Sequence, residues 1–501
     1  MQAHLNVDSQ TAGRAGRLRW IFWVGFAVSA VLMAAASRGD LTLDEVLSLQ
    51  KAESAKSWLE IITQNQNDNN HLLNTFFLRL LGEQQHLFVY RIPAVVFGIA
   101  TLAVLGLTAR RWGREESVWA VYLAGWSCPM ILYCSEARGY APAMFFAVVS
   151  FELLQRCGER CTPAKLLLFW ASLCLGFLSH FSFGIICVGL GIWSLVHERT
   201  AGSSLRGVGL KALKYFAIPA VLLTGIYLVY IRHMIILGGK VYTRREVVGA
   251  AASYALGFVD VAELRWVAIL FAAALIGGGL WMLLRQRRDE WIFLTLVLLI
   301  LPALVLLFLN PRFLYFRYFM VCFPFFYLLL AFAFAGWFRV SGPKIKMVLL
   351  LLALAITVGH LVKVAGLLDS GRGHYRRALQ DMAAATPGPL IQVGSDNDFR
   401  NGTLLNFYAR FLPPSKQLEY IPAERRNQER PDWMIEFCLD PTFQAYPDLE
   451  VGSIGKYDLF GVYPFSGLSG WSWFVYYRHP EPSGGVKSHV NPAPDINGHS
   501  P

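Results

Sequence analysis

Two short charged segments could carry chemistry in a chain that is otherwise strongly apolar. The first is Asp44-Glu45, and the second is Glu136-Ala-Arg138-Gly-Tyr140. A carboxylate can accept the proton of a hydroxyl group held within about 3 Å, and the planar guanidinium group of arginine matches the oxygens of a phosphate. Charged side chains are costly next to hydrocarbon and usually have a function there. The two segments therefore predict a site that combines a general base with an anion clamp.

Further polar residues are candidates for the same site. Asn69-Asn70-His71 precedes an amphipathic segment and begins 25 residues after the first carboxylate. Arg317 and Tyr318 open the tenth apolar stretch of the chain. Because Arg317 is expected one to two turns inside that stretch, a buried anionic partner such as a lipid phosphate would explain it. We predict that Asn70, His71, Arg317 and Tyr318 bind substrate.

Each candidate also has a purely structural explanation. Asp44 and Glu45 suit the first turn of a helix, where carboxylates complement the helix dipole. Glu136 and Arg138 could simply pair with each other. Arg91, at the start of the second apolar stretch, is interpreted as an anchor at the membrane interface.

The elements that must position these residues are membrane helices. The 501 residues are 55% hydrophobic and 16% charged, whereas soluble proteins have about 25% charged residues. Apolar runs of the length that a membrane-spanning helix needs occur at 18–36, 89–109, 117–134, 138–155, 164–180, 182–197, 213–231, 266–284, 291–309, 313–337 and 347–367. We predict about eleven transmembrane helices, with a weaker segment at 247–260 that is interfacial or re-entrant.

The basic residues indicate orientation rather than nucleic-acid binding, despite a net charge of +11. They cluster at alternate helix ends, for example at 110–114, 156–165 and 285–288. This distribution is typical of the positive-inside rule. It places the N-terminus in the cytoplasm, and the two charged segments and the C-terminal region outside. The eight cysteines show neither a disulfide framework nor zinc-ligand spacing.

Composition divides the chain into four parts. We predict a polar, disordered N-terminal tail at 1–17, a membrane body at 18–368, a small α/β domain at 369–479 and a disordered tail at 480–501. The outer loop at 40–88 has two amphipathic segments, 43–59 and 71–81, which suit helices in the headgroup plane. Alternating patterns predict strands at 390–393, 433–437, 457–463 and 473–477, and helices at 374–385 and 404–411.

The order of these motifs resembles that of the GT-C glycosyltransferases, especially bacterial relatives of the protein O-mannosyltransferases and the lipid A aminoarabinose transferase. Tyr133-Cys-Ser-Glu136-Ala-Arg138-Gly-Tyr140 is similar to the family's Tyr-x-Ser-x-Glu-Ala-Arg-x-Tyr turn. Asp44-Glu45, Asn69-Asn70-His71, Tyr90-Arg91-Ile-Pro93 and Arg317-Tyr318 follow in their expected places, so the resemblance covers about residues 18–340. This chain has His71-Leu72-Leu73 where many members have His-Pro-Pro.

The resemblance implies a polytopic, all-α membrane enzyme in the bacterial inner membrane. Such enzymes move a sugar from a polyprenyl-phosphate donor to a lipid, glycan or protein acceptor on the periplasmic face. It implies Asp44, with Glu45 beside it, as the catalytic base of an inverting displacement. Glu136, Arg138 and Tyr140 would contact substrate. Some members hold a divalent metal near their acidic residues, so Asp44 and Glu136 are possible ligands, although no cofactor is certain.

The main alternative function is a transporter or flippase of lipid-linked sugars. Such a protein would also need a groove and cationic residues. Transporters often show inverted repeats and broken helices near the membrane midplane. No internal repeat is visible, and the unusual charges lie on one predicted face, which favours the transferase.

Overall fold

The computed structural model describes residues 2–64, 66–236, 241–309, 313–452 and 454–478. The chain forms two compact units, which are described separately. One contains Met1–His374 with Pro464–Trp471, and the other contains Tyr375–Tyr463 with the segment that begins at Ser472. The predicted tail at 480–501 lies outside the described residues.

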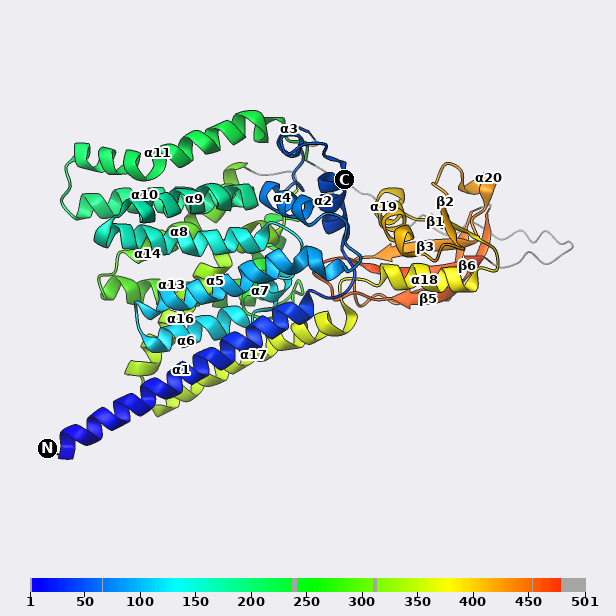
Figure 1. Cartoon of the computed structure of the whole chain (residues 1–501). Helices are drawn as coiled ribbons and strands as arrows, with labels where there is room; N and C mark the ends of the chain where they lie inside the picture. The colour runs from blue at the N-terminus through cyan, green and yellow to red at the C-terminus, as the bar shows by residue number, and fades with distance from the viewer. Residues whose placement is uncertain (1, 65, 237–240, 310–312, 453, 479–501) are drawn as a thin grey trace, which may run out of the picture. The chain divides into compact units, whose positions relative to one another are not determined.

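The first unit is helical, and its long helices run side by side (Figure 1). Its α-helices are α1 (Gln2–Ala36), α2 (Leu43–Ser54), α3 (Glu60–Thr63), α4 (Leu72–Leu81), α5 (Ile92–Arg110), α6 (Arg114–Gly125), α7 (Cys128–Tyr133), α8 (Tyr140–Arg160), α9 (Pro163–Ser179), α10 (Gly184–Thr200), α11 (Leu205–Val229), α12 (Arg244–Ala255), α13 (Arg265–Arg285), α14 (Glu290–Thr295), α15 (Leu301–Leu304), α16 (Phe323–Val340) and α17 (Pro343–Ser370). Short 3₁₀ segments occur at Leu87–Arg91, Phe181–Phe183, Ile231–His233 and Phe316–Cys322, and π-helical turns at Leu296–Ile300 and Val305–Leu309.

Eight helical stretches among the described residues are long and apolar enough to cross a membrane. They correspond to eight of the eleven predicted spans. The predicted span at 117–134 is instead two helices, α6 and α7. The break occurs because Ser127 caps α7 through Met130 N and Pro129 lacks the N–H that a continuous helix would need. Predicted spans 138–155 and 164–180 correspond to α8 and α9, so the count of eleven stays a prediction.

One further prediction about local structure differs from the observed elements. The N-terminal stretch predicted to be disordered is helical from Gln2, because α1 continues through it. The segment at 247–260 contains most of the short helix α12, which starts at a capping box formed by Thr243 and Glu246, and its interfacial or re-entrant position stays a prediction.

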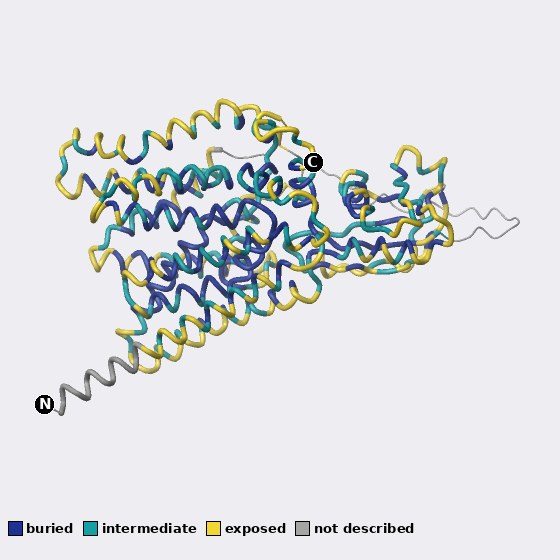
Figure 2. The backbone as a smooth tube through the Cα atoms, in the orientation of Figure 1, coloured by how far each residue is buried: buried dark blue, intermediate teal, exposed yellow. Residues whose placement is uncertain are grey.

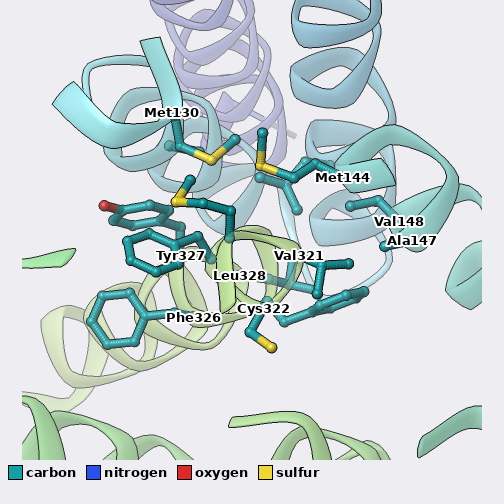
Figure 3. Packing of buried hydrophobic residues seen from close by; sticks show 14 of the residues in the cluster. Met130, Met144, Ala147, Val148, Val321, Cys322, Phe326, Tyr327 and Leu328 are labelled. Carbon is teal, nitrogen blue, oxygen red and sulfur yellow. The ribbon is translucent and has the colours of Figure 1, made fainter. Parts of the chain in front are cut away.

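The core of the first unit is built around α16. Every residue from Phe323 to Gly336 is buried, as expected for a helix that is apolar on all sides. Met130 of α7, Met144 of α8 and Tyr327 of α16 belong to the same packed cluster (Figure 3). By contrast, α11 and α17 are exposed along much of their length (Figure 2). Their large apolar residues are among the exposed ones, and Val221 of α11 is 75% exposed. Such exposure suits contact with lipid rather than water.

The outer loop at 40–88 contains both helices that were expected there, and each is shorter than predicted. Helix α2 ends at Ser54, before the predicted end at 59, because the guanidinium of Arg79 in α4 binds the carbonyl groups of Ala52, Ala55 and Lys56. Helix α4 begins at Leu72, close to the predicted 71. A cation on the last carbonyls of a helix satisfies acceptors that the helix itself leaves open.

The second unit is a small α/β domain, as predicted. Its six strands have the order β2-β1-β3-β6-β5-β4, with β2, β1 and β3 parallel and the remaining pairs antiparallel. The four predicted strands correspond to β1, β3, β5 and β6. The short, charged β2 and β4 were not predicted, and α19 begins earlier than expected because Asn397 caps it. The elements are α18 (Tyr375–Ala385), β1 (Leu390–Ser395), α19 (Asp398–Tyr408), β2 (Gln417–Tyr420), α20 (Arg426–Glu429), β3 (Trp433–Cys438), β4 (Asp448–Val451), β5 (Gly455–Tyr463) and β6 (Ser472–Arg478), with a 3₁₀ turn at Ala409–Phe411.

Candidate functional site

Asp44 stands at the centre of the cluster of candidate residues. Its Oδ2 lies 2.9 Å from Nη1 of Arg138 and 3.6 Å from Nη2 of Arg317. The Asp44 side chain is 30% exposed, so a substrate can reach it, whereas Arg138 is 5% exposed. Burial alone would raise the pKa of Asp44, but the two arginines outweigh it and hold the pKa below its usual value. Asp44 is therefore an ionised carboxylate at neutral pH.

Glu45, the neighbouring predicted catalytic residue, is fully occupied by structural contacts. It completes the capping box of α2 by accepting from the N–H and the hydroxyl of Thr42 at 2.9 and 3.1 Å. Arg91 binds both of its oxygens at 2.7 Å, and the N–H of Ala137 donates to Oε1 at 2.8 Å. Despite burial, Arg91 lowers the pKa of Glu45 to about 2. A carboxylate with both oxygens engaged in this way is unsuited to proton transfer, so the prediction of a catalytic role for Glu45 is corrected to a positioning one.

Arg91 is a buried clamp and not the interface anchor that the sequence suggested. Its side chain is fully buried. Besides Glu45, it donates to the carbonyl oxygens of Ser37, Arg38, Gly39 and Asp40, at 2.7–3.2 Å. It therefore holds the loop between α1 and α2, and with it the start of the helix that carries the candidate base.

The turn between α7 and α8 is fixed from several sides. Asn74 of α4 donates to the carbonyl of Ala137 at 2.7 Å, and Arg138 donates to Asn69 at 2.9 Å. Asn69 in turn donates to the backbone carbonyl of Asp44 at 3.1 Å. Gly139 is required because a Cβ there would lie 1.8 Å from the carbonyl oxygen of Ser179. These contacts determine where the Arg138 guanidinium lies.

An aromatic wall of uncharged rings adjoins Arg138. The ring centroids of His71 and His180 are 4.8 Å apart, and those of Tyr140 and His180 are 4.7 Å apart. The ring centroids of Tyr318 and His180 are 6.3 Å apart. The Cζ atom of Arg138 lies 5.0 Å from the centroid of the Tyr140 ring. Burial and the charge of Arg138 lower the pKa of His180 to about 3, and burial with the nearby cations also takes the pKa of His71 well below its usual value. Both histidines are therefore neutral. No motif in the sequence singles out His180, and only its place in the fold brings it to the site.

Asn70 is predicted to bind substrate, but in the structure its side chain is bonded within the outer loop. It is 2% exposed, donates to the carbonyl of Ile61 at 3.1 Å and accepts from the hydroxyl of Thr75 at 2.8 Å. These bonds occupy its amide within the outer loop. Asn70 is thus a structural residue, and the neighbouring Asn69 makes the contacts to Asp44 and Arg138 instead.

Glu136 lies next to a buried arginine, and its role as a substrate ligand stays a prediction. It is completely buried, and its Oε1 lies 3.5 Å from Nε of Arg372. Arg372 also donates to the carbonyls of Ala36 and Leu132 and to the hydroxyl of Ser135. This arginine ties α1, α7 and the turn together behind the site. Arg372 could not be predicted from the sequence, because nothing in the pattern near it indicates a buried partner more than 200 residues away.

The proposed metal ligands do not fit a divalent cation in this arrangement. Asp44 is paired with two arginines and Glu136 with a third. Within the described parts of the chain, no group of three or more His, Cys, Asp or Glu side chains is arranged to hold a metal. The positive guanidinium groups next to both carboxylates would repel a metal ion. We therefore assign no step to a metal.

Several buried donors at the site are unsatisfied. Nε of Arg138, the hydroxyl of Tyr140 and Nε of Arg317 have no hydrogen-bond partner among the residues that the structure describes. Buried polar groups are usually paired, and each exception needs an explanation. Three such donors around one carboxylate form a site that favours an anion or a polar ligand.

Comparison with known proteins identifies the fold. No protein-family model and no curated protein matches the sequence. Among solved structures, ArnT from Cupriavidus metallidurans bound to undecaprenyl phosphate is similar, with a TM-score of 0.53 and 13% identity over 93% of this chain and 99% of that one. Its apo state gives a TM-score of 0.52 and 13% identity over 93% of this chain and 100% of that one. The chain has the GT-C fold. The GT-C fold expected from the sequence is therefore confirmed, while identity this low shows the fold alone.

Proposed function

We propose that this protein transfers a sugar from a polyprenyl-phosphate donor to an acceptor at the periplasmic face of the bacterial inner membrane. The observation that carries the proposal is the pairing of one accessible carboxylate, Asp44, with Arg138 and Arg317. The similar structure of ArnT, which is bound to undecaprenyl phosphate, supports a donor of this class. The alternating basic clusters support a cytoplasmic N-terminus and a periplasmic C-terminal domain.

The arginines suit a phosphate leaving group. Displacement at the anomeric carbon breaks its bond to the phosphate oxygen and forms a bond to the acceptor oxygen. The phosphate thereby changes from a diester with one negative charge to a monoester that approaches two. Cations at the phosphate bind the transition state more strongly than the ground state, and such differential binding is what accelerates a reaction.

Asp44 suits the acceptor side of the same displacement. The acceptor hydroxyl must lose its proton as the new bond forms, and an adjacent carboxylate can take it. In the structure both arginines are directed to Asp44. A donor phosphate would compete for them and would leave Asp44 less strongly paired, which raises its basicity only when donor is bound.

Binding of undecaprenyl phosphate tests the proposed donor class. We expect it to raise the melting temperature of the purified protein, and we expect Arg138→Lys and Arg317→Lys to weaken the binding. Lysine keeps the charge but loses the fork-shaped pair of donors, and a hydrogen bond to a charged group is worth about 1.5–3 kcal/mol. Each variant should therefore bind about 10–100-fold more weakly.

Arg111→Lys is the matched control, since Arg111 pairs with Glu152 and Glu159 away from the site. It should bind the lipid like the wild type. Wild-type affinity in both site variants would contradict the phosphate clamp.

A further inference from the structure

We propose that His180 recognises the sugar of the donor by donating a hydrogen bond from its Nε2 to a hydroxyl group of that sugar. This inference rests on the proposed function and deepens it, because it adds a specificity-determining residue to the same site. It follows from the position of the His180 ring in the aromatic wall and from the bonds that its two nitrogens make.

The ring of His180 contacts the aromatic neighbour of each arginine in the proposed phosphate clamp. Its centroid is 4.7 Å from that of Tyr140, the ring over which Arg138 lies. It is 6.3 Å from the centroid of Tyr318, the residue that follows Arg317. Because a sugar is bonded directly to the phosphate of its donor, a phosphate held by the two arginines brings its sugar next to this wall.

The hydrogen bonds of His180 fix which ring nitrogen carries the proton. Its Nδ1 accepts from the N–H of Ser182 at 3.2 Å and lies 2.8 Å from the hydroxyl of the same residue. A neutral imidazole has one acceptor and one donor nitrogen, so the proton is on Nε2. The bond to Ser182 also caps the short turn Phe181–Phe183 and orients the ring. His180 therefore presents a fixed, neutral N–H donor.

This donor is open, and a second open group lies beside it. Within the part of the chain that the structure describes, Nε2 of His180 makes no hydrogen bond, and the buried hydroxyl of Tyr140 has no partner. His71 differs, because Nη2 of Arg138 lies 3.5 Å from its Nε2. Buried polar groups are usually paired, and each exception needs an explanation. A polar ligand that reaches both groups would provide one.

A sugar hydroxyl suits this pair of groups better than the other parts of the donor. The phosphate is assigned to the two arginines, and a polyprenyl chain has no hydrogen-bond acceptor. A hydroxyl can accept from an imidazole N–H and can also bond to a phenol. Among the three rings nearest Arg138, His180 is the most open, with 8% of its surface exposed against 5% for His71 and 2% for Tyr140.

Two substitutions separate the roles of the two ring nitrogens. The side-chain amide of asparagine reaches the position of Nδ1 of histidine, and that of glutamine reaches the position of Nε2. His180→Asn therefore keeps an acceptor for Ser182 but loses the outer donor, whereas His180→Gln keeps the outer donor but loses the acceptor. Recognition of the sugar predicts that the asparagine variant is impaired. A role only as the cap of the turn predicts the reverse.

The measurement compares two lipids that differ only by the sugar. Undecaprenyl-phosphate glucose, whose ring is fully hydroxylated, and undecaprenyl phosphate each compete with labelled undecaprenyl phosphate for the purified full-length protein. We expect His180→Asn to reduce the preference for the sugar-bearing lipid about 3–10-fold, the range that one neutral hydrogen bond contributes. His180→Gln should restore most of this preference. Undecaprenyl phosphate should bind the asparagine variant as it binds the wild type, because it has no sugar.

His197→Asn is the matched control, because His197 pairs with Asp289 and lies about 20 Å along α10 from its first residue, Gly184. It should show the wild-type preference. The inference is overturned, and the phosphate clamp is left standing, if His180→Asn keeps the preference, if only His180→Gln loses it, or if the wild type binds both lipids equally. Reduced transfer by His180→Asn with an unchanged preference would place the residue at the acceptor instead. Failure of the wild type to bind either lipid would overturn the proposed donor class itself.

Discussion

Asp44→Asn is expected to leave a well-folded protein with almost no transferase activity. General-base catalysis contributes about 10²–10⁴-fold to a rate, and asparagine cannot accept the acceptor's proton. The fold should survive, because the cap of α2 is formed by Thr42 and Glu45 rather than by Asp44. The measurement is turnover of a polyprenyl-phosphate sugar by the two purified proteins, together with their melting temperatures.

The matched control is Glu53→Gln, an exposed carboxylate on the same helix. It should retain wild-type turnover. Activity of Asp44→Asn within about threefold of the wild type would contradict the catalytic assignment, since that difference corresponds to less than about 1 kcal/mol of barrier.

Arg91→Met is expected to cause the largest loss of stability. It removes the cation that binds both oxygens of Glu45 and leaves a fully buried carboxylate without a bonded cation. Breaking a buried ion pair from one side costs about 3–5 kcal/mol. Thermal unfolding in detergent should show this loss as a markedly lower melting temperature.

The double variant Arg91→Met/Glu45→Leu provides the control, because it removes both charges together. It should recover a large part of the stability, since an apolar pair often replaces a buried ion pair without loss. A single Arg91→Met variant as stable as the wild type would show that the pair does not hold the loop.

The same pair has a characteristic dependence on acid. The pKa of Glu45 is lowered from 4.5 to about 2 in the folded protein. A lowered carboxyl pKa stabilises the fold fully above the unfolded value, and this stabilisation is lost as the pH falls from about 4.5 towards 2. The double variant should lack this part of the acid sensitivity.

The sequence predicted the membrane class and the main reactive groups because both depend on local signals. Apolar runs identify membrane helices by length alone. Asp44, Arg138 and Arg317 were conspicuous because charges are rare in such surroundings. The structure brings these three side chains together, although their roles stay predictions.

The supporting residues could not be predicted, because their roles depend on contacts between distant segments. Arg91 looked like any arginine at a helix end, but the fold buries it against Glu45. Arg372 reaches the turn at 135–136 from the end of α17. Asn70 was predicted as a ligand because the pattern could not show which of two adjacent asparagines points towards the site.

The most direct test of the proposed function is transfer by the purified protein. Wild-type protein in detergent is supplied with a polyprenyl-phosphate sugar and a membrane extract from a strain that lacks the protein, which contains unmodified acceptor. We expect polyprenyl phosphate to be released in step with the appearance of a glycosylated product, and Asp44→Asn to yield neither. Release of sugar and lipid without any glycosylated product, or equal transfer by Asp44→Asn, would contradict the account.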